Sequence, residues 1–421
     1  MNDDQNRIFI SIAAYRDPQL VPTIDDCILK ADKPGRLRFG ICWQHEADDP
    51  GIPNSNDSQF RLLDVPWQQS RGACWARAEV MKLWQGEEWF LQLDSHCRLA
   101  RGWDTKLIQY MCKIASSKPI LSTYACAFTP GDNGPLTGDP LQVGFREFSM
   151  HGIPCFAPAG IPNWKTLKEP FRARFLSAGF LFTHGKFVEE IPYDPELYFL
   201  GEEIALSMRA FTSGYDIFHP SEPIVWHEYR RTKAPKHWSD HVKSKGIDRE
   251  WHLLDSTSKT KVKQLLAGEY NGPYGLGSVR TLKEYEAYTG LDFRLRRAQD
   301  YTRRGLEPPN PKADPDWAQS FNSWQVQIEV NRASLPSAAL DDPAFWYVGI
   351  HDHDDLELYR KDVTSSEFNT VVTGQAQIII ERSFDSSRLP TKWTVWPKSR
   401  SAGWLQKIQG SLDDRTRKIV G

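Results

Sequence analysis

An aspartate and a histidine, Asp94 and His96, follow directly after the apolar run 89–93. Such a run is typical of a buried strand, along which side chains alternate between the two faces. If the extended conformation persists, Asp94 and His96 point to one side and Ser95 to the other. A carboxylate oxygen and an imidazole nitrogen suit Mn²⁺, Mg²⁺ or Zn²⁺, with coordination positions left for phosphate oxygens. The motif therefore predicts metal-assisted chemistry on a phosphorylated ligand, although surface loops also carry such pairs by chance.

A further imidazole, His227, ends a second short apolar run, 223–226. Strand ends along one edge of an α/β sheet gather ligands, so Asp94, His96 and His227 are predicted to form a three-ligand metal site. The alternative is an ordinary hydrogen-bonded histidine at a strand terminus. Residue types that bind metals also occur in the segment 351–355, His-Asp-His-Asp-Asp. This segment falls between two expected strands and is predicted to be an acidic hairpin loop.

Two glutamates, Glu202 and Glu203, follow Gly201 at the start of an expected helix. The simplest explanation is that acidic residues in a first turn interact favourably with the helix dipole. In a functional interpretation, one of them anchors substrate hydroxyls, stabilises a developing positive charge or acts as a general acid or base. The sequence does not choose between the two glutamates.

Cationic residues occur near both groups of expected ligands. Arg77 lies in a helix that leads to the Asp94 strand, and the run after His227 contains Tyr229, Arg230, Arg231 and Lys233. A guanidinium pairs with Asp94 or holds a diphosphate through two hydrogen bonds, whereas a solvated surface position is the more common alternative. The sequence contains neither a glycine-rich phosphate loop nor a serine-centred nucleophile motif.

Alternating strands and helices must position these residues, and the sequence from Arg7 onward predicts an α/β fold. Asp17 and Pro18 are expected to open the first helix, as its N-cap and first helical residue. Ser70 is expected to cap a helix over 71–84 whose buried face leaves Arg77 on another side. The segment 129–170 is rich in proline and glycine and is predicted to be a long irregular excursion. Strands are expected at 9–14, 37–43, 60–64, 89–93 and 119–124.

A proline-rich segment, 306–316, marks the predicted domain boundary because it favours a stiff, extended linker. It separates an α/β domain, 1–305, from a smaller domain, 317–421. In the latter, alternating aromatic and β-branched residues predict antiparallel β-structure of unknown role.

Composition narrows the functional classes. The formal net charge of −2 over 421 residues offers no global field to recruit nucleic acid or an acidic membrane surface. All seven cysteines precede residue 156 at irregular spacing, which indicates reduced thiols and not a disulfide framework. The N-terminus lacks the pattern of a signal peptide, and no apolar run is long enough to cross a bilayer. A cytoplasmic location is therefore expected.

Several motifs follow one another over about residues 7 to 300. They are Ile10-Ser11-Ile12-Ala13-Ala14-Tyr15-Arg16-Asp17-Pro18, Gly72-Ala73-Cys74-Trp75-Ala76-Arg77, Leu93-Asp94-Ser95-His96 with Gly102-Trp103, Gly201-Glu202-Glu203 and Trp226-His227-Glu228. Taken together, they resemble glycosyltransferase family 60, the GlcNAc-transferases that include the cytoplasmic hydroxyproline-directed enzymes. The Golgi polypeptide N-acetylgalactosaminyltransferases are similar more distantly.

The resemblance implies a GT-A type domain with a Rossmann-like mixed sheet, followed by the small β-domain. It implies that Asp94 and His96 stand in for an Asp-x-Asp motif and, with His227, bind Mn²⁺ or Mg²⁺ across the two phosphates of a UDP-sugar. UDP-GlcNAc is the expected donor, and retention at the anomeric carbon is expected.

Further implied roles concern the donor pocket. Ala13, Ala14, Tyr15 and Arg16 would line the uridine pocket, and Ser95 would lie close to the donor. Arg77 would lie beside the metal-binding aspartate, and residues 229–233 would form a lid over the diphosphate.

The acceptor is a hydroxyl on a protein or a glycan, and no nucleic acid partner or membrane span is expected. Two rival functions remain open. One is a non-catalytic glycan- or nucleotide-sugar-binding protein with a degenerate fold. The other is a zinc hydrolase, in which a metal-bound water acts without a nucleotide.

Overall fold

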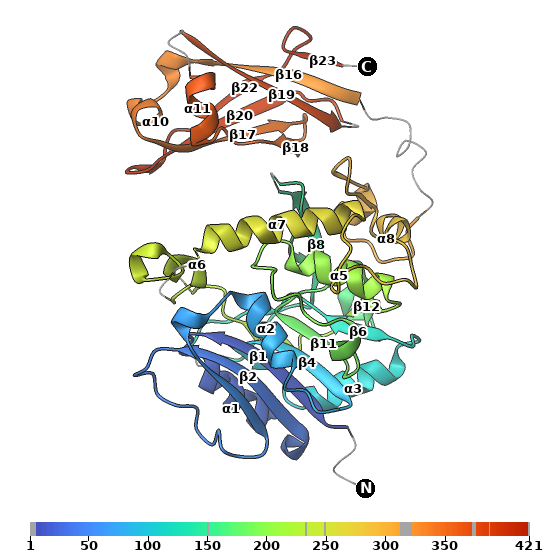
Figure 1. Cartoon of the computed structure of the whole chain (residues 1–421). Helices are drawn as coiled ribbons and strands as arrows, with labels where there is room; N and C mark the ends of the chain where they lie inside the picture. The colour runs from blue at the N-terminus through green and yellow to red at the C-terminus, as the bar shows by residue number, and fades with distance from the viewer. Residues whose placement is uncertain are drawn as a thin grey trace. The chain divides into compact units, whose positions relative to one another are not determined.

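The computed structural model of the chain describes residues 6–132, 134–149, 151–231, 234–247, 250–311, 322–372, 376–386 and 388–419, without the side chains of residues 322, 323, 365 and 385. It divides into two compact units (Figure 1). The first comprises residues 1–148, 153–294 and 298–311. The second comprises residues 312–421 with the short segments 149–152 and 295–297.

An eight-stranded mixed sheet forms the centre of the first unit, in the order β10-β12-β6-β11-β4-β1-β2-β3. Strands β3, β2, β1 and β4 run parallel to one another, whereas β11 is antiparallel to both β4 and β6. Parallel neighbours bring their carboxyl ends to the same edge, where α/β folds place ligands. The strands are β1 (Ile8–Tyr15), β2 (Leu37–His45), β3 (Phe60–Pro66), β4 (Trp89–Asp94), β6 (Pro119–Ser122), β10 (Phe171–Ala173), β11 (Phe180–His184) and β12 (Asp216–His219).

Three smaller sheets extend this unit. The first has the order β5-β13-β7 and consists of β5 (Cys97–Leu99), β13 (Val225–His227) and β7 (Cys126–Ala127). The second is the hairpin of β8 (Leu141–Phe148) and β9 (Pro154–Gly160), and the third pairs β14 (Leu291–Asp292) with β15 (Arg297–Ala298). The hairpin corrects the expectation of an irregular excursion over 129–170, because antiparallel pairing from Leu141 to Gly160 orders half of that segment.

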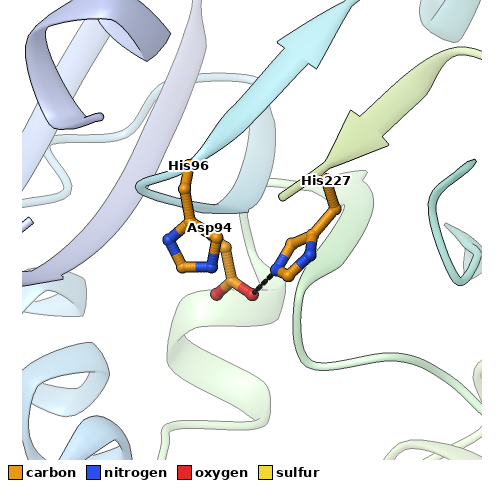
Figure 2. Close-up of side chains that lie close together, drawn as sticks. All are labelled: Asp94, His96 and His227. Carbon is orange, nitrogen blue, oxygen red and sulfur yellow. Dashed lines mark ion pairs between the residues drawn. The ribbon is translucent and has the colours of Figure 1, made fainter. Parts of the chain in front are cut away.

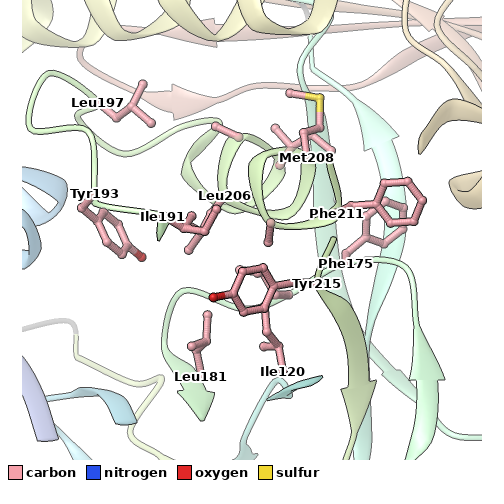
Figure 3. Packing of buried hydrophobic residues seen from close by; sticks show 14 of the residues in the cluster. Ile120, Phe175, Leu181, Ile191, Tyr193, Leu197, Leu206, Met208, Phe211 and Tyr215 are labelled. Carbon is pink, nitrogen blue, oxygen red and sulfur yellow. The ribbon is translucent and has the colours of Figure 1, made fainter. Parts of the chain in front are cut away.

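Helices cover the sheet and supply apolar side chains to its core. One large buried cluster surrounds α5, where Leu206, Met208 and Phe211 pack with residues of β6 and β11 (Figure 3). The helices are α1 (Leu20–Lys30), α2 (Ala73–Met81), α3 (Trp103–Lys113), α4 (Phe187–Glu190), α5 (Glu202–Thr212), α6 (His237–Asp240), α7 (Trp251–Ala267), α8 (Leu282–Thr289) and α9 (Asp300–Arg303). Short 3₁₀ turns cover Pro34–Arg36, Trp67–Gln69, Trp164–Thr166, Lys243–Lys245 and Arg332–Ser334. Among the described helices, none has the length and apolar character needed to cross a bilayer.

The first helix differs from its prediction. Its N-cap is Gln19, which makes no side-chain capping bond, and α1 begins at Leu20. Asp17 lies before the helix, where its Oδ1 accepts a hydrogen bond from the Gln19 backbone N–H at 3.0 Å. The other carboxylate oxygen of Asp17 therefore remains available for tertiary contacts.

The second unit is built from antiparallel strands, as the sequence predicts. One sheet has the order β19-β16-β23 and the other β18-β17-β20-β21, with β22 also paired to β20. Apolar residues between them form a separate core that includes Val326, Ile328, Trp346 and Val395. The elements are β16 (Asn322–Asn331), α10 (Ser337–Asp341), β17 (Pro343–His351), β18 (Glu357–Arg360), α11 (Ser365–Val371), β19 (Gln377–Ser386), β20 (Lys392–Ser399), β21 (Gly403–Trp404), β22 (Ile408–Ser411) and β23 (Arg417–Ile419).

Candidate functional site

Strand pairing brings the three predicted metal ligands together. Asp94 ends β4 and lies opposite Ala13 of the parallel strand β1. The chain then bends through Ser95 and His96 into β5, whose Cys97 pairs with His227 of β13. A backbone hydrogen bond of 3.1 Å from the N–H of Glu228 to the carbonyl of His96 extends this pairing. The position of His227 beside His96 thus follows from backbone hydrogen bonding.

The side chains of Asp94, His96 and His227 point toward one another (Figure 2). One ligand atom from each residue lies within 4.8 Å of the others. The Nε2 atom of His227 is 3.3 Å from Oδ2 of Asp94, and the two imidazole centroids are 4.5 Å apart. One carboxylate and two imidazoles are a donor set that fits Mn²⁺ or Zn²⁺. These three residues are therefore the candidates for binding a divalent cation.

Asp94 is held as a carboxylate by its neighbours. Burial opposes its ionisation, but the hydrogen bond from His227 and the positive charge of Arg77 bring its pKa well below the usual range. An Nη2–Oδ1 distance of 2.7 Å joins Arg77 to Asp94. Arg77 is buried in α2 and also pairs with Glu202 through Nη1. The site therefore presents a negatively charged oxygen whose orientation is fixed by a buried guanidinium.

The Asp94 carboxylate occupies a position that is free only because residue 179 is a glycine. The backbone N–H of Asp94 donates to the carbonyl of Gly179 at 3.2 Å, which brings the two chains close. A Cβ atom at position 179 would lie 2.9 Å from Oδ2 of Asp94, closer than real Cβ contacts allow. Any side chain here would displace the proposed ligand oxygen.

Asp17, which the sequence analysis assigned to a helix cap, belongs to the site. Its Oδ2 accepts a hydrogen bond from Nδ1 of His96 at 2.7 Å and from Oγ of Ser95 at 2.5 Å. Arg231 adds an ion pair of 3.0 Å to the same oxygen. The sequence does contain one sign of this role, since Asp17 is a carboxylate just after the first strand. However, Asp17 and Pro18 also match the start of a helix, and this pattern favoured the capping role.

Ser95 departs from its expected orientation. Because β4 ends at Asp94 and the chain bends, strict alternation does not continue through Ser95 and His96. The side chains of these two residues meet the same oxygen of Asp17. In the structure, Ser95 is buried and donates to this carboxylate.

The two glutamates of α5 have different surroundings. Glu202 is buried and paired with Arg77. Glu203 accepts a hydrogen bond from the hydroxyl of Tyr124 at 2.6 Å and from the backbone N–H of Ala178 at 3.0 Å. Burial raises the pKa of Glu203 to about 7, although both hydrogen bonds act to lower it. Glu203 therefore has the properties of a general acid or base near neutral pH, and Glu202 those of a structural counter-ion to Arg77.

The residues predicted to line a uridine pocket lie at the end of β1. Ala14 is fully buried and Ala13 partly so, directly beside Asp94. Tyr15 donates to Oδ2 of Asp240 at 3.0 Å. Arg16 forms ion pairs of 2.8 Å with both Asp240 and Glu46. The guanidinium of Arg16 is thus neutralised by two carboxylates that are distant in the sequence, and neither was among the predicted site residues.

The segment after His227 brings a second guanidinium to the site. Arg231 pairs with Asp17, and its Nη1 lies 3.3 Å from Nε2 of His96. Tyr229 lies next to His227, with ring centroids 4.3 Å apart, and its hydroxyl donates to the carbonyl of Ala125 at 2.9 Å. Arg230 is exposed. Lys233, which was predicted to contact the donor, lies outside the described residues.

The acidic loop of the second unit has a different arrangement. Asp352, His353 and Asp354 also come within 4.8 Å of one another. However, Oδ1 of Asp352 accepts the backbone N–H groups of Asp354 and Leu356, both at 2.9 Å, and Oδ2 pairs with Arg388 at 2.6 Å. These are the contacts of a stabilised turn, in agreement with the hairpin loop expected between two strands.

Comparison with known proteins identifies the family. A family model described as "Glycosyltransferase (GlcNAc)" matches residues 7–57 and 52–295, and no match was found among curated proteins. A crystal structure of GalNAc-T7 with UDP, GalNAc and Mn²⁺ is 14% identical, with a TM-score of 0.44, over 76% of this chain and 62% of that chain. A structure of residues 1–349 of S. aureus TarS with UDP-GlcNAc is 12% identical, with a TM-score of 0.35, over 61% of this chain and 72% of that chain. The match to the family model covers more than half of the sequence, and the chain belongs to this family of GlcNAc glycosyltransferases.

Proposed function

We propose that this protein is a metal-dependent, retaining glycosyltransferase that moves a sugar, GlcNAc in the first instance, from a UDP-sugar to a hydroxyl of a protein or glycan. Within the family, we assign it to glycosyltransferase family 60. The convergence of Asp94, His96 and His227 beside Arg77 carries the proposal. A cytoplasmic location stays a prediction.

In this proposal, Asp94, His96 and His227 hold Mn²⁺ or Mg²⁺. When bound, the cation neutralises charge that develops on the diphosphate leaving group. Arg77 keeps the carboxylate of Asp94 in place, and the bond from Nδ1 of His96 to Asp17 would leave Nε2 as the nitrogen that could bind a cation. Arg231 supplies a positive charge next to His96, where it can pair with phosphate oxygens.

The remaining predicted residues act on the donor and the acceptor. Ala13 lies beside Asp94 at the end of β1, whereas Ala14 is packed in the apolar core. Tyr15 and Arg16 would hold the edge of the uridine pocket through Asp240. Glu203 stabilises positive charge on the donor sugar or handles the acceptor proton. The acceptor hydroxyl attacks on the face that the phosphate leaves, so no enzyme nucleophile is required.

Slow hydrolysis of a panel of UDP-sugars tests the proposal without knowledge of the acceptor. UDP-GlcNAc is expected to be hydrolysed fastest, and only when Mn²⁺ or Mg²⁺ is present. NMR should show that the α-anomer of the free sugar forms first, as a retaining reaction requires. Asp94→Asn preserves the shape of the side chain and is expected to abolish hydrolysis. Hydrolysis that proceeds equally in a chelator, or in Asp94→Asn, contradicts the proposal.

Calorimetry with UDP separates the rival functions. The transferase predicts UDP binding that requires the metal. A zinc hydrolase predicts no UDP binding, and a non-catalytic binding protein predicts ligand binding without turnover. The control variant Asp26→Asn removes a carboxylate that pairs with Lys30 and accepts a hydrogen bond from the backbone N–H of Leu99, three residues after His96, and it should bind UDP normally.

A further inference from the structure

Four aromatic side chains lie on one face of the second sheet of the C-terminal unit. Across β17 and β20, the residues Trp346, Val348 and Val395 point into the core. Since side chains alternate along a strand, Phe345, Tyr347 and Trp396 occupy the opposite face, where each is partly exposed. Trp404 of β21 joins them and is 44% exposed. These four residues are called the aromatic face below.

Strand register places the four rings next to one another. Tyr347 lies opposite Trp396, and Lys398 lies opposite both Phe345 and Trp404. The ring centroids of Trp396 and Trp404 are 4.5 Å apart, and those of Phe345 and Trp404 are 5.4 Å apart. The Trp396 indole N–H donates to the carbonyl of Leu405 at 2.9 Å, which fixes the ring. Phe345, Trp404 and Trp396 therefore form a continuous surface, and Tyr347 lies beside it on the neighbouring strand.

The planes of these rings favour sugars over stacked bases. Phe345 and Trp404 meet at 83°, and Trp396 and Trp404 at 35°, so the surface is angled. Single-stranded nucleic acid needs a series of flat rings on which successive bases stack, and rings set at these angles do not form such a series. The C–H groups of a pyranose, by contrast, contact ring faces at varied angles, since an aromatic face attracts weakly positive hydrogens.

Cations border the rings. The ammonium of Lys398 lies 5.8 Å from the Phe345 centroid and 5.6 Å from that of Trp404. Lys407 lies 5.9 Å from the Trp396 centroid. Within the described residues, no carboxylate forms an ion pair with either lysine, whereas the nearby Arg360 pairs with Asp362. Two lysines beside ring faces complement a ligand that carries its own negative charges.

We propose that the aromatic face binds an acidic polysaccharide, whose sugar rings contact Trp404, Trp396 and Phe345 while its carboxylate or phosphate groups pair with Lys398 and Lys407. This inference goes beyond the proposed function and does not depend on it. It gives the C-terminal unit the role of holding a glycan.

Affinity electrophoresis of the full-length protein tests the inference. Native gels contain polygalacturonate, hyaluronate or a phosphomannan as acidic polysaccharides. Hydroxyethylcellulose represents neutral glycans, polyglutamate represents charge without sugar, and a single-stranded RNA is the nucleic acid probe. We expect retardation by at least one acidic polysaccharide, little by hydroxyethylcellulose and none by polyglutamate or RNA.

Variants connect retardation to the face. Trp404→Ala and Lys398→Met are each expected to weaken binding at least tenfold, with mobility measured relative to a gel without polysaccharide. Trp404→Phe should retain most of it. Trp251→Ala removes a tryptophan that is 36% exposed on α7, in the other unit, and should bind as wild type does. Urea unfolding followed by circular dichroism serves as the folding control, and the transition of Trp404→Ala should show that the C-terminal unit is folded under the conditions of the gel.

Several results would overturn the inference. It would fail if the wild-type protein were retarded by no acidic polysaccharide, or were retarded equally by hydroxyethylcellulose or polyglutamate. It would also be overturned if the wild-type protein bound RNA more strongly than the polysaccharides, or if Trp404→Ala bound them as well as the wild type does. None of these results bears on donor hydrolysis, so a failure here is distinct from a failure of the proposed transferase activity.

Discussion

The Asp17 carboxylate accepts the Nδ1 proton of His96 at 2.7 Å, and the aspartate side chain is only 1% exposed. This bond fixes the tautomer of the imidazole and leaves Nε2 as the electron-pair donor. Ser95 and Arg231 contact the same carboxylate oxygen, so three side chains depend on one aspartate. Asp17 therefore orients His96, a proposed metal ligand, without being part of the proposed ligand set.

Asp17→Asn is expected to lower Mn²⁺ affinity by about 10- to 100-fold, because the amide cannot hold the imidazole in the same tautomer with the same strength. Direct titration with Mn²⁺, followed by electron paramagnetic resonance, measures this effect independently of turnover. Asp26→Asn, a neutralised carboxylate of α1, should leave the affinity unchanged. An Asp17→Asn protein that is folded and binds Mn²⁺ with wild-type affinity would refute the positioning role.

Gly179→Ala is expected to reduce Mn²⁺ affinity because the new methyl group meets Oδ2 of Asp94 at 2.9 Å. The carboxylate must rotate or the strand must shift, and both changes move a proposed ligand. Gly160→Ala is the matched control, since a Cβ atom there meets nothing within 4 Å. Equal metal affinity in the two variants would show that Asp94 does not bind the ion from this position.

The pH dependence of donor hydrolysis should follow the ionisation of the Glu203 carboxyl. With a pKa of about 7, this carboxyl is about half ionised at neutral pH, so a role as an anion predicts that the rate rises through this pH. The Tyr124 hydroxyl donates to the carboxylate and stabilises its ionised form. Tyr124→Phe should therefore raise the pKa and move the midpoint of the pH profile upward, whereas Glu203→Gln should remove this transition. A midpoint that stays in place in Tyr124→Phe would assign the ionisation to another group.

The stability of the fold should fall in mild acid because of His219. Its Nδ1 donates to the carbonyl of Ser122 at 2.6 Å, and burial lowers its pKa from 6.5 to about 4. Between these pH values the unfolded chain binds a proton that the native state excludes, so the free energy of unfolding decreases as pH falls through this window. For this residue, the loss approaches roughly 3 kcal/mol.

Urea unfolding at about pH 7.5 and pH 5 measures this loss. His219→Gln should be less stable at pH 7.5 but should show a smaller decrease on acidification. His252→Gln changes a histidine whose side chain is 54% exposed and should retain the wild-type pH dependence. An identical decrease in wild type and His219→Gln would mean that other groups cause it.

The sequence predicted elements well where a local pattern decided the structure. The apolar runs before Asp94 and His227 are strands β4 and β13, and the acidic first turn after Gly201 begins α5. The convergence of Asp94, His96 and His227 was also predictable, because the topology of an α/β fold brings the ends of several strands to one edge of the sheet.

Residues whose roles depend on tertiary contacts were harder to predict. Asp17 precedes a proline, and this local pattern is the same whether its carboxylate caps a helix or reaches His96, far away in sequence. The hairpin of β8 and β9 lacked a clear alternation because a register shift between Phe145 and Glu147 breaks its period. The partners of Arg16 and Glu203 come from distant segments, which no local pattern reveals.

The backbone hydrogen bond from Glu228 to the carbonyl of His96 separates two kinds of restraint in neighbouring residues. His227 and Glu228 are held by backbone pairing with β5 and the residue before it, whereas Arg231 is held through its side chain by Asp17 and His96. In the proposed lid, Arg231 would exchange these side-chain contacts for phosphate oxygens while His227 keeps its backbone pairing. Arrival of the donor would then leave the proposed cation ligands in place.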